Sequence, residues 1–581
     1  MATEANSKGR IKFAGWVLGM LAFAVVGYAF YLQIILGPKY AKQARSQHEE
    51  HIELLPQRGK IYDRNGVPLV TDEMAASIYI LPQYVKEIPK AVEILASYNL
   101  GTPTRLERYI RSRDHFFWLR RKYDFEKALA LKKELEQARL TNAINIEEEA
   151  RRIYPWGEIT GSVVGFVGTE HKGLSGIEYS LDSMLAGQAG SAIYLKDALG
   201  RDHPSPAYPI IDARDGCNVT LTIDLDIQAI AFEELKNACV KFQAKRGYCI
   251  VMNPQSGEIL ALVDYPDFDP AHYTKYPKET WKVGSVSDEF EPGSVYKPIV
   301  AAICLEDSLA SRDEWIPTGS GILVQGRRIT DIHGKSGFTF DDVFVKSSNI
   351  GVSKLALRCG VRRFTEVSKL LGVGEQTGID LPGEGEGKID KARSMTELRL
   401  TNNSFGQGLS VTTLQLACIY ATFASGGVYN APRMVDKIEK NGRIIYESRV
   451  KELRRVFSEE TCQEVCQILQ KVVEQGTGKN ARVEGIEVCG KTGTAQKSLP
   501  DVGYSSSLST VSFAGFLPRE DAQLLAIVVV DEPGLGRFAG EIAAPAFQRI
   551  MERTLRLPQY RKIRMKYLEE QVALETTGEI K

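Results

Sequence analysis

One uninterrupted apolar stretch near the start of this chain limits what the rest of it can be. Residues 13–36 form a run of 24 residues that contains no Asp, Glu, Lys or Arg. About 20 apolar residues suffice for a helix to cross a bilayer, so the sequence predicts a transmembrane helix here. No second stretch of this kind follows, and everything after about residue 37 is therefore expected on one side of a membrane.

The residues flanking this stretch indicate its orientation. Lys8, Arg10 and Lys12 precede it, which favours a cytoplasmic tail at residues 1–12, although basic residues within 39–45 weaken the asymmetry. The alternative is a cleaved signal peptide, but the stretch exceeds the roughly 7–15 residues of a signal h-region and no A-x-A-like site follows promptly. We predict a single-pass anchor in the cytoplasmic (inner) membrane, with the larger part periplasmic or otherwise extracytoplasmic.

Composition excludes several classes of function. The 581 residues exceed one ordinary core, so two or more domains are expected. A formal net charge of +0 argues against nucleic acid as the main partner, because phosphate binding needs a positive field. The nine cysteines are scattered without a CxxC pair, so most are expected to be small buried hydrophobes. His48 and His51 resemble a metal motif, but their spacing favours a solvated helix face, and we expect no metal or cofactor.

Residues 37–225 have the pattern of a loosely built α+β region. Residues 39–53 are polar and can continue as a helix, and 58–66 read as a strand that runs into an Asn-Gly turn. Charged and apolar helical patterns extend over about 86–140. This region is expected to form a domain of its own.

Residues 226–558 have a tighter pattern, and we place a domain boundary near residue 225. The expected elements are a strand at 219–224, a helix at 226–242, a hairpin at 248–263, and strands at 511–516 and 524–530. Strands at both ends with helices between them indicate one sheet built from distant segments. Residues 559–581, basic and then acidic, are expected to be a solvated helix or tail.

Three short strings in this second region point to chemistry. They are Ser294-Val295-Tyr296-Lys297, Ser347-Ser348-Asn349 and Lys491-Thr492-Gly493. Each string is common alone. In this order they are typical of a serine acyltransferase of the penicillin-recognising kind.

Ser294 is the candidate nucleophile. It precedes an apolar helical run at 299–305, and at a helix start the free N–H groups and the helix dipole can stabilise an oxyanion. Lys297 lies one turn on and can act as base if burial, or a second cation such as Lys491, lowers its pKa. The alternative is an N-capping serine beside an exposed lysine. Pro298, interpreted as a costly proline inside a helix, favours function.

The second string offers groups for proton relay and recognition. Ser347 can pass a proton between Lys297 and a leaving group, and Asn349 offers both a donor and an acceptor to a substrate amide. The alternative is a helix N-cap, where Ser and Asn are favoured, because 350–357 reads as a helix.

The third string overlaps a nucleotide-binding pattern. Residues 485–492 fit the P-loop expression G-x-x-x-x-G-K-[ST], which requires a strand before the loop and a helix after it. Here 486–488 look like the strand itself, and no amphipathic helix opens at 493–495. We therefore favour an edge strand that carries Lys491, to which an extended peptide can add as a further strand.

With these strings in place, the chain resembles a class B penicillin-binding protein, a membrane-anchored peptidoglycan D,D-transpeptidase. Residues 58–66, 152–168 and 173–190 resemble strings of the family's pedestal domain. Strings similar to those of its transpeptidase domain are Glu291–Ser294, Thr377–Gly383, Ser404–Gly408 and Gly476–Gly478. The resemblance runs from the anchor to about residue 558.

The resemblance implies an α+β multidomain architecture. The transmembrane helix at 13–36 would be followed by an α+β pedestal (penicillin-binding protein dimerisation-type) domain at 37–225. Residues 226–558 would form a β-lactamase-like transpeptidase domain with a mainly antiparallel sheet flanked by helices.

The resemblance also implies roles for the site residues. Ser294 would attack the D-Ala-D-Ala carbonyl of a stem pentapeptide, with Lys297 as the base and Ser347 as the relay. D-Ala leaves, and an amine of a neighbouring stem peptide completes the cross-link. β-Lactams would acylate Ser294 and deacylate slowly.

Substrate binding is implied for a second group of residues. Asn349 would hold the substrate amide, and Lys491 would act electrostatically. Thr492 and Thr494 would lie near the terminal carboxylate, and Gly493 would let the peptide approach closely. The backbone N–H groups of Ser294 and Thr494 would form the oxyanion hole.

Residues 349–356 resemble the septal, cell-division (FtsI-type) branch, whereas the elongation branch usually has aspartate in place of Asn349. Because no glycosyltransferase domain is recognisable, the resemblance implies an FtsW-like glycosyltransferase and other division proteins as partners. The alternatives are an elongation-type enzyme, a β-lactamase or DD-carboxypeptidase, a β-lactam sensor and an inactive scaffold. The large region before residue 225, the single membrane stretch and the intact motifs argue against all of these except the elongation-type enzyme.

Overall fold

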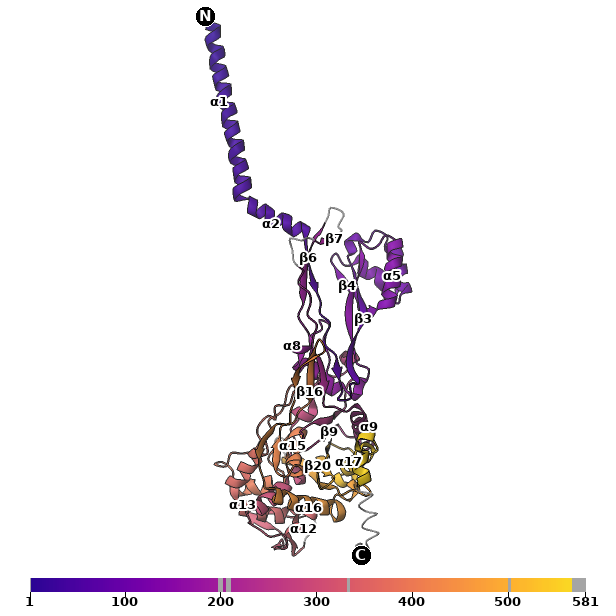
Figure 1. Ribbon diagram of the computed structural model, residues 1–581, viewed down its shortest axis with the longest axis vertical. Helices are drawn as coiled ribbons and strands as arrows, with labels where there is room; N and C mark the ends of the chain where they lie inside the picture. The colour runs from indigo at the N-terminus through magenta and orange to yellow at the C-terminus, as the bar shows by residue number, and fades with distance from the viewer. Residues whose placement is uncertain (1, 197–201, 205–209, 332–334, 500–502, 567–581) are drawn as a thin grey trace. The chain divides into compact units, whose positions relative to one another are not determined.

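The computed structural model describes residues 2–196, 202–204, 210–331, 335–499 and 503–566 (Figure 1). The chain forms two compact units. The first consists of Met1–Gln57 and Gly187–Gly216, and the second of Arg58–Ala186 and Cys217–Lys581.

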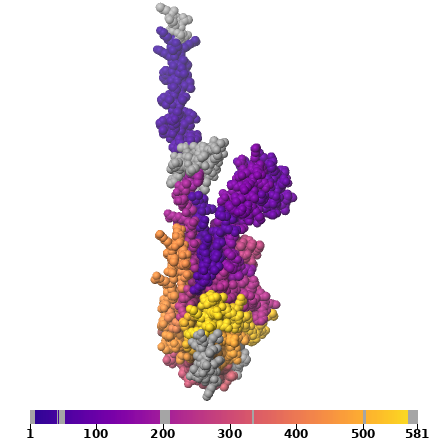
Figure 2. All heavy atoms as spheres, turned by 45° about the vertical axis from the view of Figure 1, so that its right-hand side comes forward, coloured from indigo at the N-terminus to yellow at the C-terminus, as the bar shows by residue number. Residues whose placement is uncertain are grey.

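The first unit begins with a long apolar helix. α1 (Ala2–Phe30) continues through a π-helical turn, Tyr31–Ile35, and α2 (Gly37–His48) follows. The stretch Lys8–Ile35 is 28 residues long, and its most apolar window has no buried residue. Figure 2 shows the side chains of this indigo helix exposed to the surroundings. The helix has the length and composition for membrane anchoring at the predicted place.

The polar helix after the anchor ends earlier than expected. α2 stops at His48, and β1 (Glu49–Leu54) pairs antiparallel with β6 (Gly190–Lys196), which also pairs with β7 (Asp202–Pro204). The prediction of a helix over 39–53 is wrong for its last residues, because β1 is stabilised by a strand far along the chain. The side chains of His48 and His51 lie outside the described part of the structure.

The second unit opens with the strand and turn expected at 58–66. β2 (Ile61–Tyr62) pairs antiparallel with β3 (Pro68–Ile80), and Gly66 takes a φ of +81° in the turn between them. A positive φ is readily adopted by glycine, which explains the Asn-Gly signal.

Around β3 a small α+β layer forms. β4 (Phe117–Asp124) and β5 (Ile144–Ile153) pair antiparallel with β3 on its two sides. The helices that share their core are α3 (Ile88–Ser97), α4 (Pro103–Arg111) and α5 (Phe125–Gln137). The expected helical pattern over 86–140 is therefore interrupted by β4. Trp118 there packs edge-on against Tyr79 of β3 at 5.4 Å, a cross-strand contact that the local pattern does not reveal.

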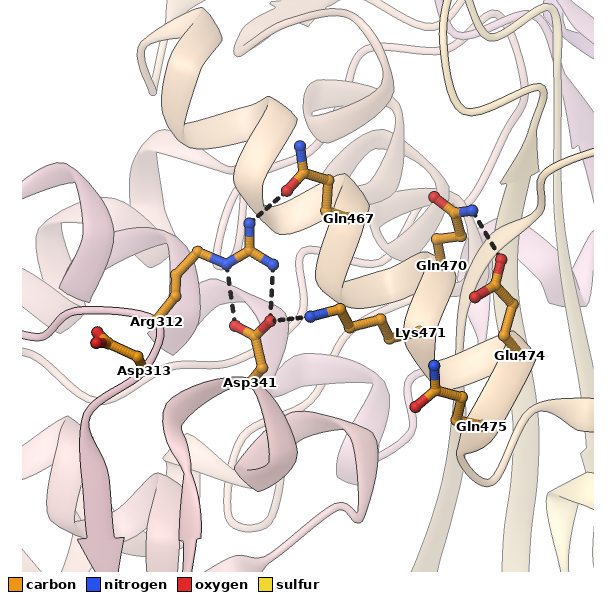
Figure 3. A pocket seen from close by; sticks show the side chains of 8 residues that line it. All are labelled: Arg312, Asp313, Asp341, Gln467, Gln470, Lys471, Glu474 and Gln475. Carbon is orange, nitrogen blue, oxygen red and sulfur yellow. Dashed lines mark hydrogen bonds and ion pairs between the residues drawn. The ribbon is translucent and has the colours of Figure 1, made fainter. Parts of the chain in front are cut away.

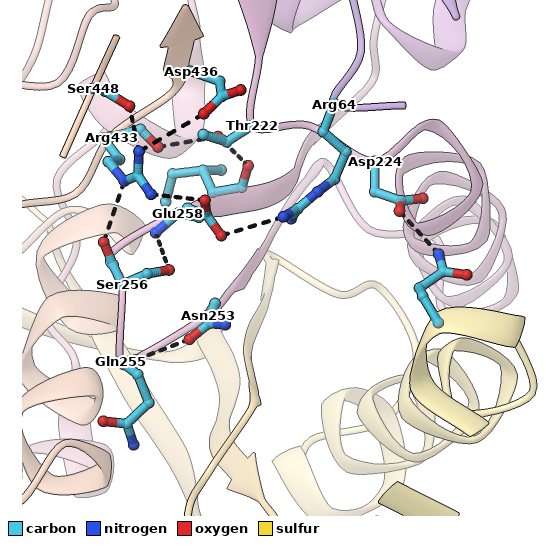
Figure 4. A network of polar contacts seen from close by, with 12 residues as sticks. Arg64, Thr222, Asp224, Asn253, Gln255, Ser256, Glu258, Arg433, Asp436 and Ser448 are labelled. Carbon is cyan, nitrogen blue, oxygen red and sulfur yellow. Dashed lines mark hydrogen bonds and ion pairs between the residues drawn. The ribbon is translucent and has the colours of Figure 1, made fainter. Parts of the chain in front are cut away.

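One sheet runs across the boundary expected near residue 225. β8 (Asn218–Leu221) lies between β2, to which it is parallel, and β16 (Val435–Lys440), to which it is antiparallel; β17 (Arg443–Glu447) continues the sheet. Figure 4 shows the polar network beside it, in which Glu258 accepts from Arg433 at 2.7 Å and from Arg64 at 3.4 Å. Strands from both expected domains thus share one hydrogen-bonded layer.

A network of buried ion pairs connects residues between 58 and 182 of this unit. Glu178, whose side chain is fully buried, accepts from Arg58 Nε at 2.7 Å and from Arg152 Nε at 2.6 Å. Arg58 also reaches Asp182 at 2.7 Å, and Arg152 reaches Asp72 at 3.2 Å. The network joins the strings 58–66, 152–168 and 173–190.

The later part of this unit is built on a five-stranded antiparallel sheet in the order β10-β9-β21-β20-β19. Its strands are β9 (Arg246–Met252), β10 (Ile259–Tyr265), β19 (Cys489–Leu499), β20 (Gly503–Leu517) and β21 (Leu524–Asp531). The expected hairpin and the two late strands are confirmed, as is a sheet assembled from distant segments. β19 lies at its edge.

Helices cover both faces of this sheet (Figure 1). In β9, Tyr248, Ile250 and Met252 face one apolar core, and Cys249 and Val251 face the other. The helices are α9 (Leu225–Lys241) and α17 (Ala539–Thr554) with the second core, and α11 (Pro298–Glu306), α13 (Asn349–Leu370), α15 (Thr413–Ala424) and α16 (Glu459–Gln475) with the first. Because strand side chains alternate, a sheet buried on both faces reads as continuous apolar runs.

The cysteines behave as expected. All nine are free thiols and buried. The start of the predicted tail is ordered, since Gln559 donates to Asp224 at 3.0 Å; residues 567–581 lie outside the described part.

Candidate active site

Ser294 lies in a 3₁₀ turn, Gly293–Tyr296, that leads directly into α11. Ser294 is half-buried, whereas Lys297 is fully buried one turn later. Pro298 is the first residue of α11, a position where proline is favoured because its missing N–H has no helical partner. The interpretation of Pro298 as a costly proline inside the helix is therefore wrong.

The Lys297 amino group connects the first two strings. Its Nζ donates to Ser347 O at 2.6 Å, to Ser347 Oγ at 3.1 Å and to Asn349 Oδ1 at 2.8 Å. Lys491, also fully buried, donates from Nζ to the same Ser347 Oγ at 3.2 Å and to Thr492 O at 3.2 Å. The three strings, which the sequence predicted to form one site, thus meet at the Ser347 hydroxyl.

Burial favours the neutral form of both lysines. Burial, and secondarily the charge of Lys491, hold the pKa of Lys297 well below its ordinary value, while Asp331 opposes this shift. Burial lowers the pKa of Lys491 to about 7. A buried ammonium beside another cation loses its proton readily, so Lys297 can serve as a base.

The second string occupies the turn between α12 (Phe340–Val345) and α13. Ser347 has a φ of +59°, a left-handed conformation that side chains other than glycine adopt rarely. Ser348 caps α13, since its Oγ accepts from Gly351 N at 2.9 Å. The helix-cap alternative is therefore right for Ser348, while Ser347 and Asn349 face Lys297.

Asp331 is a site residue that sequence reasoning missed. Its carboxylate accepts from Asn349 N and from Ser348 Oγ at 2.5 Å each and from Ile350 N at 3.0 Å. An acceptor at this helix N-terminus satisfies free N–H groups and complements the helix dipole. No spacing rule connects Asp331 to a string 16 residues later, so the pattern of the chain gave no signal for it.

Replacing Asp331 with asparagine should move the pH dependence of acylation at Ser294. Asn keeps an oxygen for the N–H groups of Asn349 and Ile350 but removes the charge that raises the pKa of Lys297. The neutral base then persists to lower pH, so the midpoint of the rate–pH curve should fall. Asp331→Ala also removes the acceptor for the N–H groups of Asn349 and Ile350, so acylation of Ser294 should be about tenfold slower in that variant. A midpoint that stays in place or rises in Asp331→Asn would contradict this assignment.

A second cluster of ion pairs, centred on Asp341, holds the helix that precedes the Ser347 turn. Asp341 of α12 accepts from Arg312 Nη2 at 2.7 Å and from Lys471 Nζ of α16 at 2.7 Å (Figure 3). Burial alone would raise the pKa of Asp341, but the two cations hold it below the usual range. These contacts fix α12 against α16. The turn that carries Ser347 begins at the end of α12.

Lys491 lies inside β19 and not in a phosphate-binding loop. The strand begins at Cys489, so the expectation of a strand at 486–488 is wrong by a few residues, and no helix follows Gly493. Gly493 pairs with Ser512 of β20. A Cβ there would lie 2.9 Å from Pro292 O and 2.5 Å from Ser512 Oγ, which explains the glycine. The geometry is that of an edge strand beside the turn that carries Ser294.

The remaining residues of the third string line the same edge. Thr492 Oγ1 lies 2.5 Å from Thr477 Oγ1, and Thr494 is exposed. The two segments approach closely, because a Cβ on Gly293 would lie 2.9 Å from Thr494 O. All eight residues predicted for the site are therefore near the turn that carries Ser294 or on the strand beside it.

Comparison with known proteins agrees with this arrangement. The family profile of the penicillin binding protein transpeptidase domain matches residues 247–552, and that of the penicillin-binding protein dimerisation domain matches residues 53–221. Stage V sporulation protein D of Bacillus subtilis is 32% identical over 93% of this chain and 84% of its own length. Peptidoglycan D,D-transpeptidase FtsI of Escherichia coli is 31% identical over 93% of this chain and 90% of its own.

The fold is also found in solved structures. Penicillin binding protein 3 of Mycobacterium tuberculosis, crystallised with aztreonam, superposes with a TM-score of 0.68 at 27% identity, covering 87% of this chain and 96% of that one. The profile match extends over more than half of the chain, and the relatives match along most of their length. This chain belongs to the class B penicillin-binding proteins, in which a dimerisation domain precedes the transpeptidase domain.

Proposed function

We propose that this protein is a peptidoglycan D,D-transpeptidase that works through an acyl-enzyme on Ser294. The observation that carries the proposal is the buried Lys297, with a lowered pKa, one turn from Ser294 and bonded to Ser347 and Asn349. The transpeptidase profile and the name of the E. coli relative support the same activity.

The proposed acylation follows from this geometry. Neutral Lys297 accepts the proton of the Ser294 hydroxyl while Oγ attacks the carbonyl carbon of the penultimate D-Ala. Collapse of the tetrahedral intermediate forms an ester and breaks the amide bond to the terminal D-Ala. Ser347, bonded to both lysines, passes a proton to the leaving amine. An amine from a second stem peptide then attacks the ester and restores Ser294.

The substrate is held along β19 in this proposal. Asn349 binds the substrate amide, and Lys491, Thr492 and Thr494 bind the terminal carboxylate, while Gly493 leaves room for the peptide backbone. Backbone N–H groups of Ser294 and Thr494 stabilise the oxyanion, because fixed donors aimed at developing charge lower the barrier. The close approach of Gly293 to Thr494 supports this pairing.

Labelling with a fluorescent penicillin tests the proposal. The wild-type chain should form a stable covalent adduct, and digestion followed by mass spectrometry should find the added mass on the peptide that contains Ser294. A matched sample denatured before labelling should carry no adduct. An adduct on another residue, or none at all, would refute the proposed function.

We further propose that the protein acts in septal wall synthesis with an FtsW-like glycosyltransferase and other division proteins. Asn349 and the residues after it support the division branch, as does similarity to FtsI of E. coli. Depletion should give filamentous cells, whereas rounded cells would indicate the elongation branch. Normal cross-linking by this chain without a co-purifying glycosyltransferase would argue against the partner.

The proposed topology places residues 1–12 in the cytoplasm, 13–36 in the cytoplasmic membrane and the pedestal (37–225) and transpeptidase (226–558) domains outside it, followed by a tail at 559–581. The apolar helix at Lys8–Ile35 supports the anchor. A protease added to the outside of intact spheroplasts should cleave the catalytic domain; full protection would contradict the orientation.

A further inference from the structure

A cavity of about 710 Å³ lies beside β19, immediately past Thr494. Ala495 and Gln496 of the strand line one side of it, and Glu289 and Glu291, shortly before Ser294, line another. Cavities of 300–1,000 Å³ are typical of binding sites for small groups. The mechanism above gives this cavity no role.

The direction of β19 decides which part of a bound peptide reaches the cavity. A peptide that adds to this edge with its terminal carboxylate near Lys491 and Thr492 runs antiparallel to β19. At about 3.4 Å per residue, the residue before D-Ala-D-Ala, two positions earlier, then lies opposite Thr494, directly next to Ala495. Its side chain is therefore the group placed at the cavity.

The cations of the cavity are already paired. Lys497 Nζ lies 2.6 Å from Asp531 and 2.7 Å from Glu532. Lys245 lies 3.2 Å from Glu532, and Arg246 lies 2.7 Å from Asp288. Two further carboxylates line the cavity, those of Glu289 and Glu291. Neither takes part in these ion pairs.

The two glutamates lie on one side of an extended segment. Phe290 between them exchanges two backbone hydrogen bonds of 3.0 Å with Val411, and in extended chain alternate side chains share a face. Glu289 accepts from Gly387 N at 3.0 Å and from Ser410 Oγ at 2.7 Å. Each of its oxygens therefore has a neutral donor.

Glu291 is less well satisfied. Its Oε1 accepts from Gly408 N at 2.9 Å and Tyr504 Oη at 3.2 Å, but its Oε2 is buried without a hydrogen-bond partner. Among the residues that the structure describes, no Lys or Arg makes an ion pair with it; the nearby Arg399 is bonded to Asp390 at 2.8 Å. Burial raises the pKa of Glu291, as expected for a carboxylate that lacks a close cation.

The proposed reaction supplies a cation of the right kind. The acceptor stem peptide must carry an amine, and donor and acceptor are the same kind of molecule, so the donor carries that amine too. In the donor this amine does not react, and as a charged ammonium it must be accommodated by the enzyme or by solvent. We propose that the cavity binds the side-chain ammonium of the residue preceding D-Ala-D-Ala in the donor peptide, through Glu291 Oε2 and with Glu289 beside it. This inference rests on the proposed function and specifies its substrate.

Such a contact also gives selectivity. An ammonium donates charge-assisted bonds to the carboxylates, whereas a neutral side chain of the same length leaves Glu291 Oε2 buried and unpaired. The donor is then selected by its own amine before acylation begins.

Penicillins with matched side chains test the inference, because the acylamino group of a penicillin takes the place of the residue before D-Ala-D-Ala. We would use three probes: one with an ammonium-ended alkyl side chain, one with methyl replacing the ammonium, and one with both ammonium and carboxylate at the end. The acylation rate constant of each is measured on the full chain by competition with fluorescent penicillin. The third probe separates a lysine-like donor from a diamino-diacid donor.

The ratio of the ammonium to the methyl rate constant should be at least about tenfold in the wild type and approach one in Glu291→Gln, with a smaller fall in Glu289→Gln. Using a ratio within each variant removes general losses of activity. Glu460→Gln, at an exposed position on α16, is the matched control and should keep the wild-type ratio.

The outcomes separate this inference from the proposed function. If both probes acylate Ser294 at equal rates in the wild type, the ammonium subsite is wrong and the transpeptidase remains. If Glu291→Gln folds and keeps the full preference, the subsite lies elsewhere and the assignment fails. If Glu291→Gln does not fold, the wild-type ratio and Glu289→Gln still decide. If no penicillin acylates the chain, the proposed function fails and this inference fails with it.

Discussion

Lys297→Ala should slow acylation of Ser294 by penicillin about 10³-fold, within the range that a positioned general base contributes. Lys297 is the only group that the structure places both one turn from Ser294 and in contact with Ser347, among the described residues. Its removal leaves the serine hydroxyl without a proton acceptor. The second-order rate constant with a fluorescent penicillin measures the effect.

The pH dependence of acylation in the wild type should also reveal the role of Lys297 as base. Acylation needs neutral Lys297, so the rate should rise as pH increases through the lowered pKa of that group. Lys491 loses its charge above about pH 7, which weakens binding of the carboxylate of penicillin, so the rate should fall again. The curve should be bell-shaped, with two values that belong to the interacting pair.

Lys346→Ala is the control for Lys297→Ala. Lys346 is an exposed lysine directly before Ser347 that donates to Gln475 O at 3.3 Å. Its removal should change the rate constant less than about twofold, as is usual for exposed positions. Similar losses in both variants would show that the effect is structural and not that of the base.

Glu178→Ala should destabilise the second unit by about 3–5 kcal/mol, because it leaves Arg58 and Arg152 buried with their shared carboxylate gone. The side chains of these arginines are 3% and 1% exposed, so water cannot replace the lost partner. Asp182 and Asp72 remain as partial partners. Urea unfolding followed by tryptophan fluorescence should give a midpoint well below that of the wild type.

Glu107→Ala is the matched control for this substitution. Glu107 pairs with Arg111 one helical turn away at 2.9 Å, with both side chains about half exposed. Exposed pairs of this kind contribute less than about 1 kcal/mol. A loss in Glu178→Ala no greater than that in Glu107→Ala would mean that the buried network does not stabilise the fold.

The elements with strong local patterns could be predicted from the sequence. α9, the hairpin β9–β10 and the late strands β20 and β21 lie where apolar runs and turn residues put them. The errors at β1 and β4 share one cause. Each strand is stabilised by hydrogen bonds to a strand distant in sequence, and local propensity does not contain that partner.

For the site, too, the local motifs could be predicted and the contacts between distant segments could not. Motif order predicted that Ser294, Lys297, Ser347 and Lys491 belong together, and the hydrogen bonds to Ser347 Oγ bring the two lysines together there. Asp331 escaped notice because only the folded chain carries it to the start of α13.

The sequence by itself determined the anchor, the α+β class and the chemical groups of the site, because these depend on apolar length, periodicity and residue type. Only the tertiary structure decided how the groups act. Burial of Lys297 and Lys491 against one hydroxyl lowers their pKa values, and desolvation is a property of packing and not of spacing. The cavity past Thr494, with its unpaired Glu291 oxygen, likewise exists only where distant segments meet.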